Sequence, residues 1–171
     1  GIEGAAVDSR AIRSGQLFVA LKAERDGHDY VGAAFEAGAA ASLVSAETGN
    51  EPVVVVDDTF GALTALATAA RDRVRGQVIG ITGSVGKTST KDLLAAALGR
   101  RFRVSASAKS FNNELGVPLT VLNTPDDAEA LVVEMGARGR GHIAALCAVA
   151  RPSIGVVTTV GLSHAEFFGT L

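Results

Sequence analysis

One run of residues has the composition that phosphate binding requires. Residues 80–89 read Gly-Ile-Thr-Gly-Ser-Val-Gly-Lys-Thr-Ser and follow an apolar segment. Glycines let the main chain approach a ligand and aim several N–H groups at phosphate oxygens. Lys87 adds a mobile positive charge, and the Thr88 hydroxyl is an oxygen ligand of the kind that Mg²⁺ prefers. The pattern predicts a nucleotide site whose cofactor-binding residues are Gly83, Ser84, Val85, Gly86, Lys87, Thr88 and Ser89.

This run departs from the common phosphate-loop pattern G-x-x-x-x-G-K-[ST] at one position. The first glycine of that pattern falls on Ile81. The alternative is a glycine-rich turn between a strand and a helix that carries a lysine by chance. Because the loop, the lysine, the threonine and the flanking elements agree, the phosphate loop is the favoured interpretation.

Two further side chains are candidates for a metal site. Glu134 ends an apolar segment, where a lone carboxylate is unfavourable unless it is paired or bound to a metal. The alternative for Glu134 is a strand end that is open to solvent. His164 follows a Gly-Leu-Ser turn, where an isolated histidine is either a surface residue or a ligand.

Polar residues outside the loop form three smaller groups. Ser9 and Arg10 follow an aspartate, and Arg10 suits a phosphate, although such a group is also typical of a polar turn. His28 stands in Asp-Gly-His-Asp, as a turn residue or as a ligand contact. Asn112 and Asn113 can orient phosphates or substrate, or they can cap a turn through their side-chain amides.

The elements that must position these side chains alternate between strand and helix. In the first part of the chain, strands are expected over residues 17–21, 40–44 and 52–56. A helix capped by Asp29 is expected to end near residue 37 at Gly38, and a second helix runs from Asp57 or Asp58 to about residue 75.

A second series of elements begins after Gly76, which is the expected domain boundary. Strands are expected over 77–82, 102–104, 131–134 and 154–158, and helices over 87–98 and 143–150. This alternation predicts an α/β fold with parallel sheets, in which residues 1–75 and 76–171 form separate domains.

Composition excludes several classes of protein. Sixteen Lys+Arg against eighteen Asp+Glu give a net charge of −2, whereas nucleic-acid clamps are strongly basic. The single cysteine, Cys147, rules out an internal disulfide framework and is expected to be a small buried hydrophobe rather than a nucleophile. No apolar run approaches the roughly 18 residues of a membrane span, and no basic leader opens the chain. We therefore expect a cytoplasmic protein with neither nucleic-acid binding nor membrane insertion.

The glycine loop is similar to that of the Mur ligase family, the ATP-dependent amide-bond-forming enzymes of peptidoglycan synthesis. The family's loop has the short form G-[ST]-x-G-K-[ST]-[ST], which residues 83–89 match without an outer glycine. Residues 8–29 resemble the family's uridine-nucleotide domain. Residues 111–120, 133–137 and 150–169 resemble the member that adds D-alanyl-D-alanine, whereas the sister ligase that adds the third amino acid has a Thr-Thr-Pro run in the first of these segments.

The resemblance implies a fold, a reaction and a set of site residues. The fold is a small N-terminal α/β domain that binds the UDP-sugar-peptide (1–75), followed by part of a parallel-sheet P-loop ATPase domain (76–171). ATP and Mg²⁺ serve as cofactors, and UDP-N-acetylmuramoyl-tripeptide and D-alanyl-D-alanine are joined through an acyl phosphate. The residues implied are Lys87 and His164 in catalysis, Thr88, Glu134 and His164 at the metal, Asn112 and Asn113 at the nucleotide, and Ser9, Arg10 and His28 at the substrate.

The family also sets limits on the expectation. Thr159 stands where the family often has asparagine, and the family's enzymes are far longer than 171 residues. Residues 1–171 alone are therefore not expected to catalyse the reaction, because the acceptor dipeptide is expected to bind to a part of the enzyme outside them. The full-length protein is expected to be a monomer. The alternatives are the Mur ligase that adds the third amino acid and a P-loop kinase or ATPase acting on a small molecule.

Overall fold

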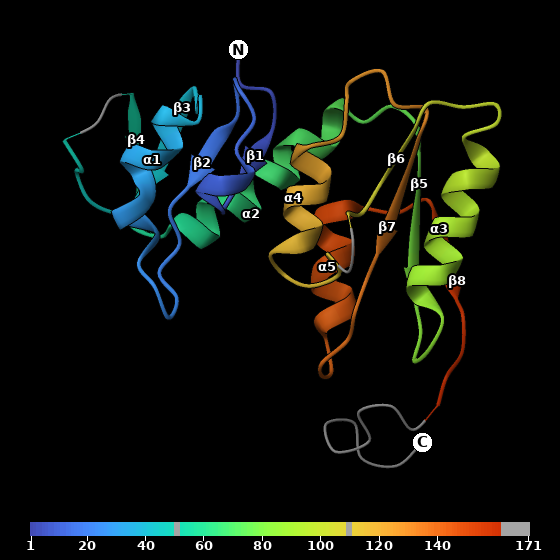
Figure 1. Ribbon diagram of the computed structural model, residues 1–171. Coiled ribbons are helices and arrows are strands. Elements are labelled where there is room, and N and C mark those ends of the chain that lie inside the picture. The colour runs from blue at the N-terminus through green and yellow to red at the C-terminus, as the bar shows by residue number, and fades with distance from the viewer. Residues whose placement is uncertain (50–51, 109–110, 162–171) are drawn as a thin grey trace. The chain divides into compact units, whose positions relative to one another are not determined.

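The computed structural model describes residues 1–49, 52–108 and 111–161. They form two compact units that divide between Leu66 and Ala67, and each unit has its own four-stranded sheet (Figure 1). All pairings between named strands are parallel, so the predicted α/β class is confirmed. No helix in these ranges is long and apolar enough to cross a bilayer.

The division lies before the predicted boundary at Gly76. Helix α2 (Thr59–Ala70) runs through it and continues into η3 (Arg71–Arg73). The last turn of α2 belongs to the second unit because Ala67 and Ala70 pack in its core, as does Val74 after η3. A hydrophobic pattern marks a helix but not the unit against which each of its turns packs. The separate ligands expected for the two domains stay a prediction.

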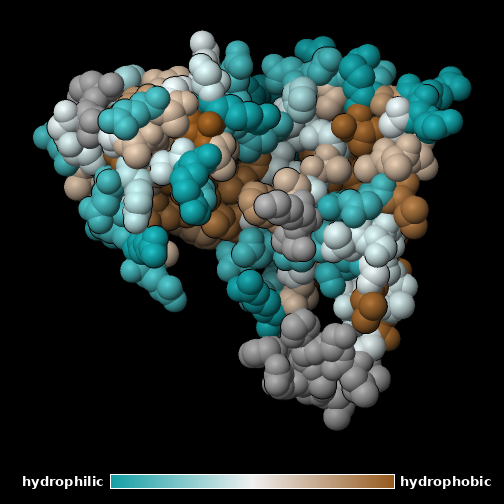
Figure 2. Space-filling view, in the orientation of Figure 1, coloured by the Kyte–Doolittle hydropathy of each residue, from teal (hydrophilic) through white to brown (hydrophobic). Residues whose placement is uncertain are grey.

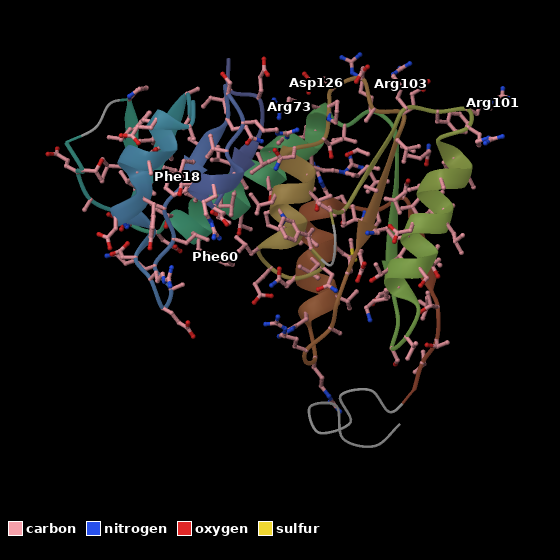
Figure 3. All side chains as sticks on the ribbon, viewed as in Figure 1. Phe18, Phe60, Arg73, Arg101, Arg103 and Asp126 are labelled. Carbon is pink, nitrogen blue, oxygen red and sulfur yellow. The ribbon has the colours of Figure 1, made fainter. Side chains whose placement is uncertain are left out.

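Unit 1 contains the strands β1 (Ala5–Ala6), β2 (Leu17–Val19), β3 (Ala41–Val44) and β4 (Val53–Val55), which pair in that order. Its short helices are η1 (Ser9–Ala11), η2 (Gly27–Tyr30) and α1 (Val31–Glu36). Strands β2 and β3 are buried throughout and apolar except at Ser42, as expected of central parallel strands. Phe18, labelled in Figure 3, packs with α1 in this core.

The start of α1 differs from the sequence prediction. Asp29 does not cap this helix, because η2 precedes α1 and the capping residue of η2 is Asp26, which accepts the His28 amide. The predicted end is confirmed, since Gly38 follows α1 with a φ of +100°, a conformation that suits glycine.

Unit 2 has the strand order β6-β7-β5-β8, formed by β6 (Val104–Ala106), β7 (Ala130–Glu134), β5 (Gln77–Thr82) and β8 (Ile154–Val157). Its helices are α3 (Lys87–Leu98), α4 (Gly116–Leu122) and α5 (His142–Ala150). Figure 1 shows α4 and α5 on one side of this sheet and α3 on the other. Helix α4 was not predicted from the sequence.

Side-chain alternation along β5 and β7 divides the core of unit 2 into two faces. One face carries the residues that pack with α4 and α5, namely Val78, Leu131 and Val133. The other face carries the residues that pack with α3, namely Ile79, Ile81, Ala130 and Val132. Residues two apart on a strand share a face, so Glu134 continues the Ala130–Val132 row and lies on the face of α3.

The two ends of this sheet differ in chemistry. Arginines gather where the strands begin, around Arg73, Arg101 and Arg103, and hydrophilic side chains follow that edge (Figures 2 and 3). Arg103 pairs with Asp127, and Arg73 lies 3.9 Å from Asp126. Arg73 and Arg103 are therefore balanced by acids of the loop before β7. The carboxyl ends of the strands meet at the opposite edge, where the glycine loop begins.

Arg71 ties the end of α2 to the end of α5 within unit 2. Its guanidinium donates to the carbonyl oxygens of Ala150, Val74 and Arg151 at 2.6, 2.8 and 3.1 Å. Partial burial lowers the pKa of Arg71 from its ordinary value, and the three carbonyls offset that unfavourable desolvation.

We expect Arg71→Met to destabilise the protein by about 2 kcal/mol, because two partly buried carbonyl oxygens lose a charged donor. Thermal unfolding should show this as a melting temperature lower by about 4–8 °C. The matched control is Arg73→Met, whose exposed side chain makes a long ion pair with Asp126 and no other polar contact within the described residues. It should change stability by less than about 0.5 kcal/mol. Equal effects of the two substitutions would contradict the structural role of Arg71.

Candidate nucleotide and metal site

The glycine loop connects β5 to α3 and requires glycine at its first position. Gly83 has a φ of +134°, and a Cβ there would lie 2.2 Å from the Thr158 Oγ1 atom. Gly86 has a φ of +86° and forms the N-terminal cap of α3. The short form of the loop, without the outer glycine, is therefore built around close contact with the segment that follows β8.

Lys87 spans the loop from the first turn of α3. Its ammonium donates to the Gly83 carbonyl oxygen at 2.7 Å and to that of Ser84 at 3.4 Å. The positive charge is thus held over the turn where phosphate is expected. Both contacts are with main-chain oxygens, so the ammonium can exchange them for phosphate oxygens without leaving an ion-pair partner behind.

The loop amides divide into two sets. The Ser84 amide donates to the Thr159 carbonyl oxygen at 2.9 Å, and the Val85 amide donates to Thr159 Oγ1 at 3.2 Å. The amides of residues 86–89 have no hydrogen-bond partner within the part of the chain that the structure describes. These four amides open α3, where the helix dipole also favours an anion. Thr159 therefore supports the loop, and the second half of the loop offers the unpaired donors.

Glu134 lies at the end of β7, next to the end of β5. In the sheet register it is paired with Ile81, one residue before β5 ends. Its side chain is buried at 1% exposure, and its Oε1 accepts the Asn112 amide at 2.8 Å. Its Oε2 has no partner among the described residues. The alternative of a strand end that is open to solvent is therefore excluded, because the Glu134 side chain is buried.

The donor set at this edge fits Mg²⁺. An unpartnered buried carboxylate oxygen and the Thr88 hydroxyl are hard oxygen ligands. Mg²⁺ usually keeps several waters and is held by one or two protein oxygens together with phosphate. Within residues 1–49, 52–108 and 111–161, no three His, Cys, Asp or Glu side chains gather as a metal site. The third expected ligand, His164, lies outside these ranges.

The paired asparagines have different surroundings. The Asn113 Oδ1 accepts the amides of Leu115 and Gly116 at 3.3 and 2.8 Å, so this side chain caps the start of α4. Asn112 holds Glu134 with its amide, and its carbonyl oxygen accepts the Gly136 amide at 2.7 Å. Asn112 therefore orients the carboxylate, and a contact of either asparagine with the nucleotide stays a prediction.

Ser9 and Arg10, the substrate candidates of unit 1, lie in η1. The Arg10 guanidinium binds both carboxylate oxygens of Asp8, at 2.9 and 2.7 Å. The Arg10 side chain and then its amide lower the pKa of Asp8 to about 2. The contacts with Asp8 hold the Arg10 guanidinium in one direction. The side chain is 88% exposed, so its charge stays accessible to an anion.

His28, the third substrate candidate, has both ring nitrogens engaged. Its Nδ1 lies 2.5 Å from Asp26 Oδ1, and its Nε2 accepts the Ser45 amide at 2.8 Å. The His28 amide and then its ring lower the pKa of Asp26. The ring therefore connects η2 to the end of β3. This is the role of a turn residue, which was one of the two alternatives that the sequence offered for His28. Its contact with substrate stays a prediction.

Several residues around the site were missed or set aside at the sequence level. Lys91 of α3 is buried, and so is Ser107 after β6. A lysine four residues after Lys87 on a helix with apolar neighbours was the available signal for Lys91, whereas nothing local singled out Ser107. Cys147 lies 3.8 Å from the Met135 sulfur and packs against the core, but it is partly buried rather than fully buried as expected.

Comparisons with known proteins agree with this geometry. A family model described as the Mur ligase middle domain matches residues 81–171. A UDP-N-acetylmuramoyl-tripeptide–D-alanyl-D-alanine ligase from Bacillus subtilis is 45% identical over 174 residues, which cover 99% of this chain and 38% of that protein. The crystal structure of MurF from Acinetobacter baumannii matches with a TM-score of 0.86 at 32% identity, covering 99% of this chain and 38% of that one. MurF ligase from Thermotoga maritima, solved in complex with ADP, matches with a TM-score of 0.82 at 38% identity, covering 98% of this chain and 40% of that one.

The chain thus spans about 38% of the length of the ligases that it matches first. The family model begins within β5 and takes in the glycine loop and Glu134, which are the parts of the site that the structure brings to one edge of the sheet. Since that model matches more than half of the chain, the protein belongs to the Mur ligase family.

Proposed function

We propose that the full-length protein is an ATP-dependent ligase that joins D-alanyl-D-alanine to UDP-N-acetylmuramoyl-tripeptide in peptidoglycan precursor synthesis. The observation that carries this proposal is Glu134, a buried carboxylate with one oxygen unpartnered among the described residues, at the sheet edge where the lysine loop begins. Relatives that are named for this reaction match nearly the whole chain and support the proposal.

In the proposed reaction, the terminal carboxylate of the tripeptide attacks the γ-phosphorus of ATP, and ADP leaves as an acyl phosphate forms. The amine of D-alanyl-D-alanine then attacks the acyl carbon, phosphate leaves, and the amine gives up one proton as the amide forms. Phosphoryl transfer of this kind depends mainly on positioning and on neutralisation of charge. A lysine-bearing loop with unpaired amides meets both requirements.

The geometry of the loop supports most of the roles proposed for unit 2. The amides of residues 86–89 and the Lys87 ammonium hold the ATP phosphates, and Asn112 keeps Glu134 directed. Thr88 and Glu134, with His164 as the further ligand, would hold Mg²⁺, which would supply positive charge to the phosphates. His164 is also proposed as a catalytic residue on the strength of the family resemblance.

The roles proposed for unit 1 concern the uridine nucleotide. Arg10 has an exposed guanidinium already oriented by Asp8, which suits recognition of a phosphate at low entropic cost. Ser9 lies beside it in η1. His28 contributes by fixing the turn at η2, and a direct contact with substrate is part of the proposal.

The proposal is tested by phosphate release from ATP in the full-length gene product. Release should require both UDP-N-acetylmuramoyl-tripeptide and D-alanyl-D-alanine. Omission of either substrate should lower it at least about 100-fold, since the site then lacks one of the two reactants that it holds together. Two control reactions separate the alternatives. Turnover of UDP-N-acetylmuramoyl-dipeptide with a diamino acid would indicate the ligase that adds the third amino acid. Phosphate release that needs neither peptide substrate would indicate a kinase or an ATPase.

A further inference from the structure

Lys91 is a buried charge that the proposed reaction does not use. It is 3% exposed and is the residue of α3 that lies fully inside, on the helix that opens with Lys87 and Thr88. Lysine is almost never this buried unless its ammonium has polar partners. Its partners therefore indicate what the charge holds in place.

Two of the groups that the ammonium of Lys91 contacts differ in exposure. The ammonium donates to the Ser107 carbonyl oxygen at 3.0 Å, in a buried hydrogen bond. It also lies 3.1 Å from Asp92 Oδ1, but the Asp92 side chain is 68% exposed. Solvent screens the second contact far more than the first. The buried bond to Ser107 is the contact that positions the neighbouring strand.

Ser107 connects the ends of two strands. Its amide donates to the Val132 carbonyl oxygen at 2.9 Å and so continues the pairing of β6 with β7. Its hydroxyl oxygen accepts the Glu134 amide at 3.1 Å. The Thr120 hydroxyl lies 3.4 Å from the same oxygen. Every polar atom of Ser107 is thus used, and its hydroxyl fixes the main chain of the residue that carries the candidate metal-binding carboxylate.

These contacts form one connection across the site. Lys91 lies three residues after Thr88 on α3, so a link from Lys91 through Ser107 to Glu134 joins the helix that carries one candidate metal ligand to the strand that carries the other. Lys91 and Glu134 lie between α3 and the sheet, because Glu134 is on the face of the sheet that α3 covers and Lys91 is the buried residue of α3.

We propose that Lys91 is a positioning residue for divalent-metal binding, acting through Ser107 on Glu134. This inference rests on the proposed function, since it assumes that Glu134 holds the metal. Groups that orient a metal ligand from outside the coordination sphere change metal affinity by about 10- to 100-fold when they are removed. Loss of Lys91 should therefore weaken metal binding without removing any group that touches the nucleotide.

The experiment measures Mn²⁺ binding to the full-length gene product by electron paramagnetic resonance of free Mn²⁺, with ADP present. Lys91→Met should bind Mn²⁺ about 10- to 100-fold more weakly. ADP binding in EDTA, followed by calorimetry, should change less than about twofold, because the loop is untouched. Asp92→Asn is the matched control, and it should leave Mn²⁺ binding unchanged, since the exposed partner has no contact with Ser107 in the described structure.

A second variant keeps the test decisive if Lys91→Met does not fold. Ser107→Ala retains the carbonyl that Lys91 contacts but removes the acceptor of the Glu134 amide. It should weaken Mn²⁺ binding similarly, and the double variant should lose little more, because groups in one network are not additive.

Unchanged Mn²⁺ affinity in folded Lys91→Met or in Ser107→Ala would overturn the positioning role, as would an equal loss of metal-free ADP binding. Failure of the unmodified protein to bind Mn²⁺ with ADP would instead overturn the proposed function, and the inference with it.

Discussion

Substitution of Lys87 by alanine is expected to lower ATP-dependent amide formation by about 10²- to 10³-fold, the scale measured when one donor to a developing negative charge is removed. The structure gives two reasons for an effect of this size. The ammonium is the positive charge of the loop itself, and it also bridges the Gly83 and Ser84 carbonyl oxygens that shape the turn. The rate of phosphate release with both peptide substrates present measures this effect in the full-length protein.

The control for Lys87→Ala removes the same charge from the far end of the same helix. Arg100 is exposed and follows the end of α3. Arg100→Ala should leave turnover within about twofold, because an exposed charge that far along the helix is screened. Far-ultraviolet circular dichroism of both variants shows whether α3 is retained. A folded Lys87→Ala variant with turnover near that of the unmodified protein would remove Lys87 from the chemistry.

The loop could be predicted from sequence because its signals are local. Residues 77–98 form a strand, a glycine turn and a helix in succession, and each part has its own signature in the sequence. The predicted strand at 77–82 and the helix at 87–98 are confirmed at the same bounds. The requirement for glycine at position 83 has a cause that no local pattern contains, because the obstructing atom, Thr158 Oγ1, comes from beyond β8.

Helix α4 could not be predicted because it has no polar face to give periodicity. Its residues from Gly116 to Val121 are all buried, and a helix buried all round lacks the apolar stripe of a surface helix. Pro118 also resembles a break, although proline is tolerated in the first turn, where the amide has no helical partner. The short strand β1 escaped prediction for a related reason, since two alanines are identified as a strand only by pairing with β2.

The surroundings of Glu134 depend on the order of strands rather than on the order of residues. Asn112 donates to the Glu134 carboxylate, Ser107 accepts the Glu134 amide, and Lys91 donates to Ser107. The link through Ser107 exists because β6 and β7 are neighbours and α3 covers their shared face. Sequence reasoning placed Glu134 at the end of an apolar strand and left its burial open. The burial of Glu134 and the lack of a partner for its Oε2 atom among the described residues could be found only from the fold.

Glu134→Gln is expected to separate function from stability. Glutamine keeps the shape of the side chain and an oxygen to accept the Asn112 amide, but it removes the charge. Phosphate release should fall about 10²-fold at saturating ATP, and the Mg²⁺ concentration for half-maximal rate should rise at least about tenfold, since a neutral amide is a poorer ligand of a hard cation. A titration of the rate with Mg²⁺ measures both effects.

The same substitution should leave the metal-free protein as stable as before, or more stable. A buried carboxylate oxygen without a partner is held at an unfavourable free energy, and removal of its charge relieves that. Glu129→Gln, at an exposed residue just before the same strand, is the control, and it should alter neither the Mg²⁺ dependence nor the melting temperature beyond about 1–2 °C. A lower melting temperature for Glu134→Gln with an unchanged Mg²⁺ dependence would identify the carboxylate as part of the hydrogen-bonded core. A raised or equal melting temperature together with a weakened Mg²⁺ dependence would identify a metal-binding carboxylate. The buried charge of Glu134 is unfavourable in the metal-free protein and becomes favourable when a cation binds to it.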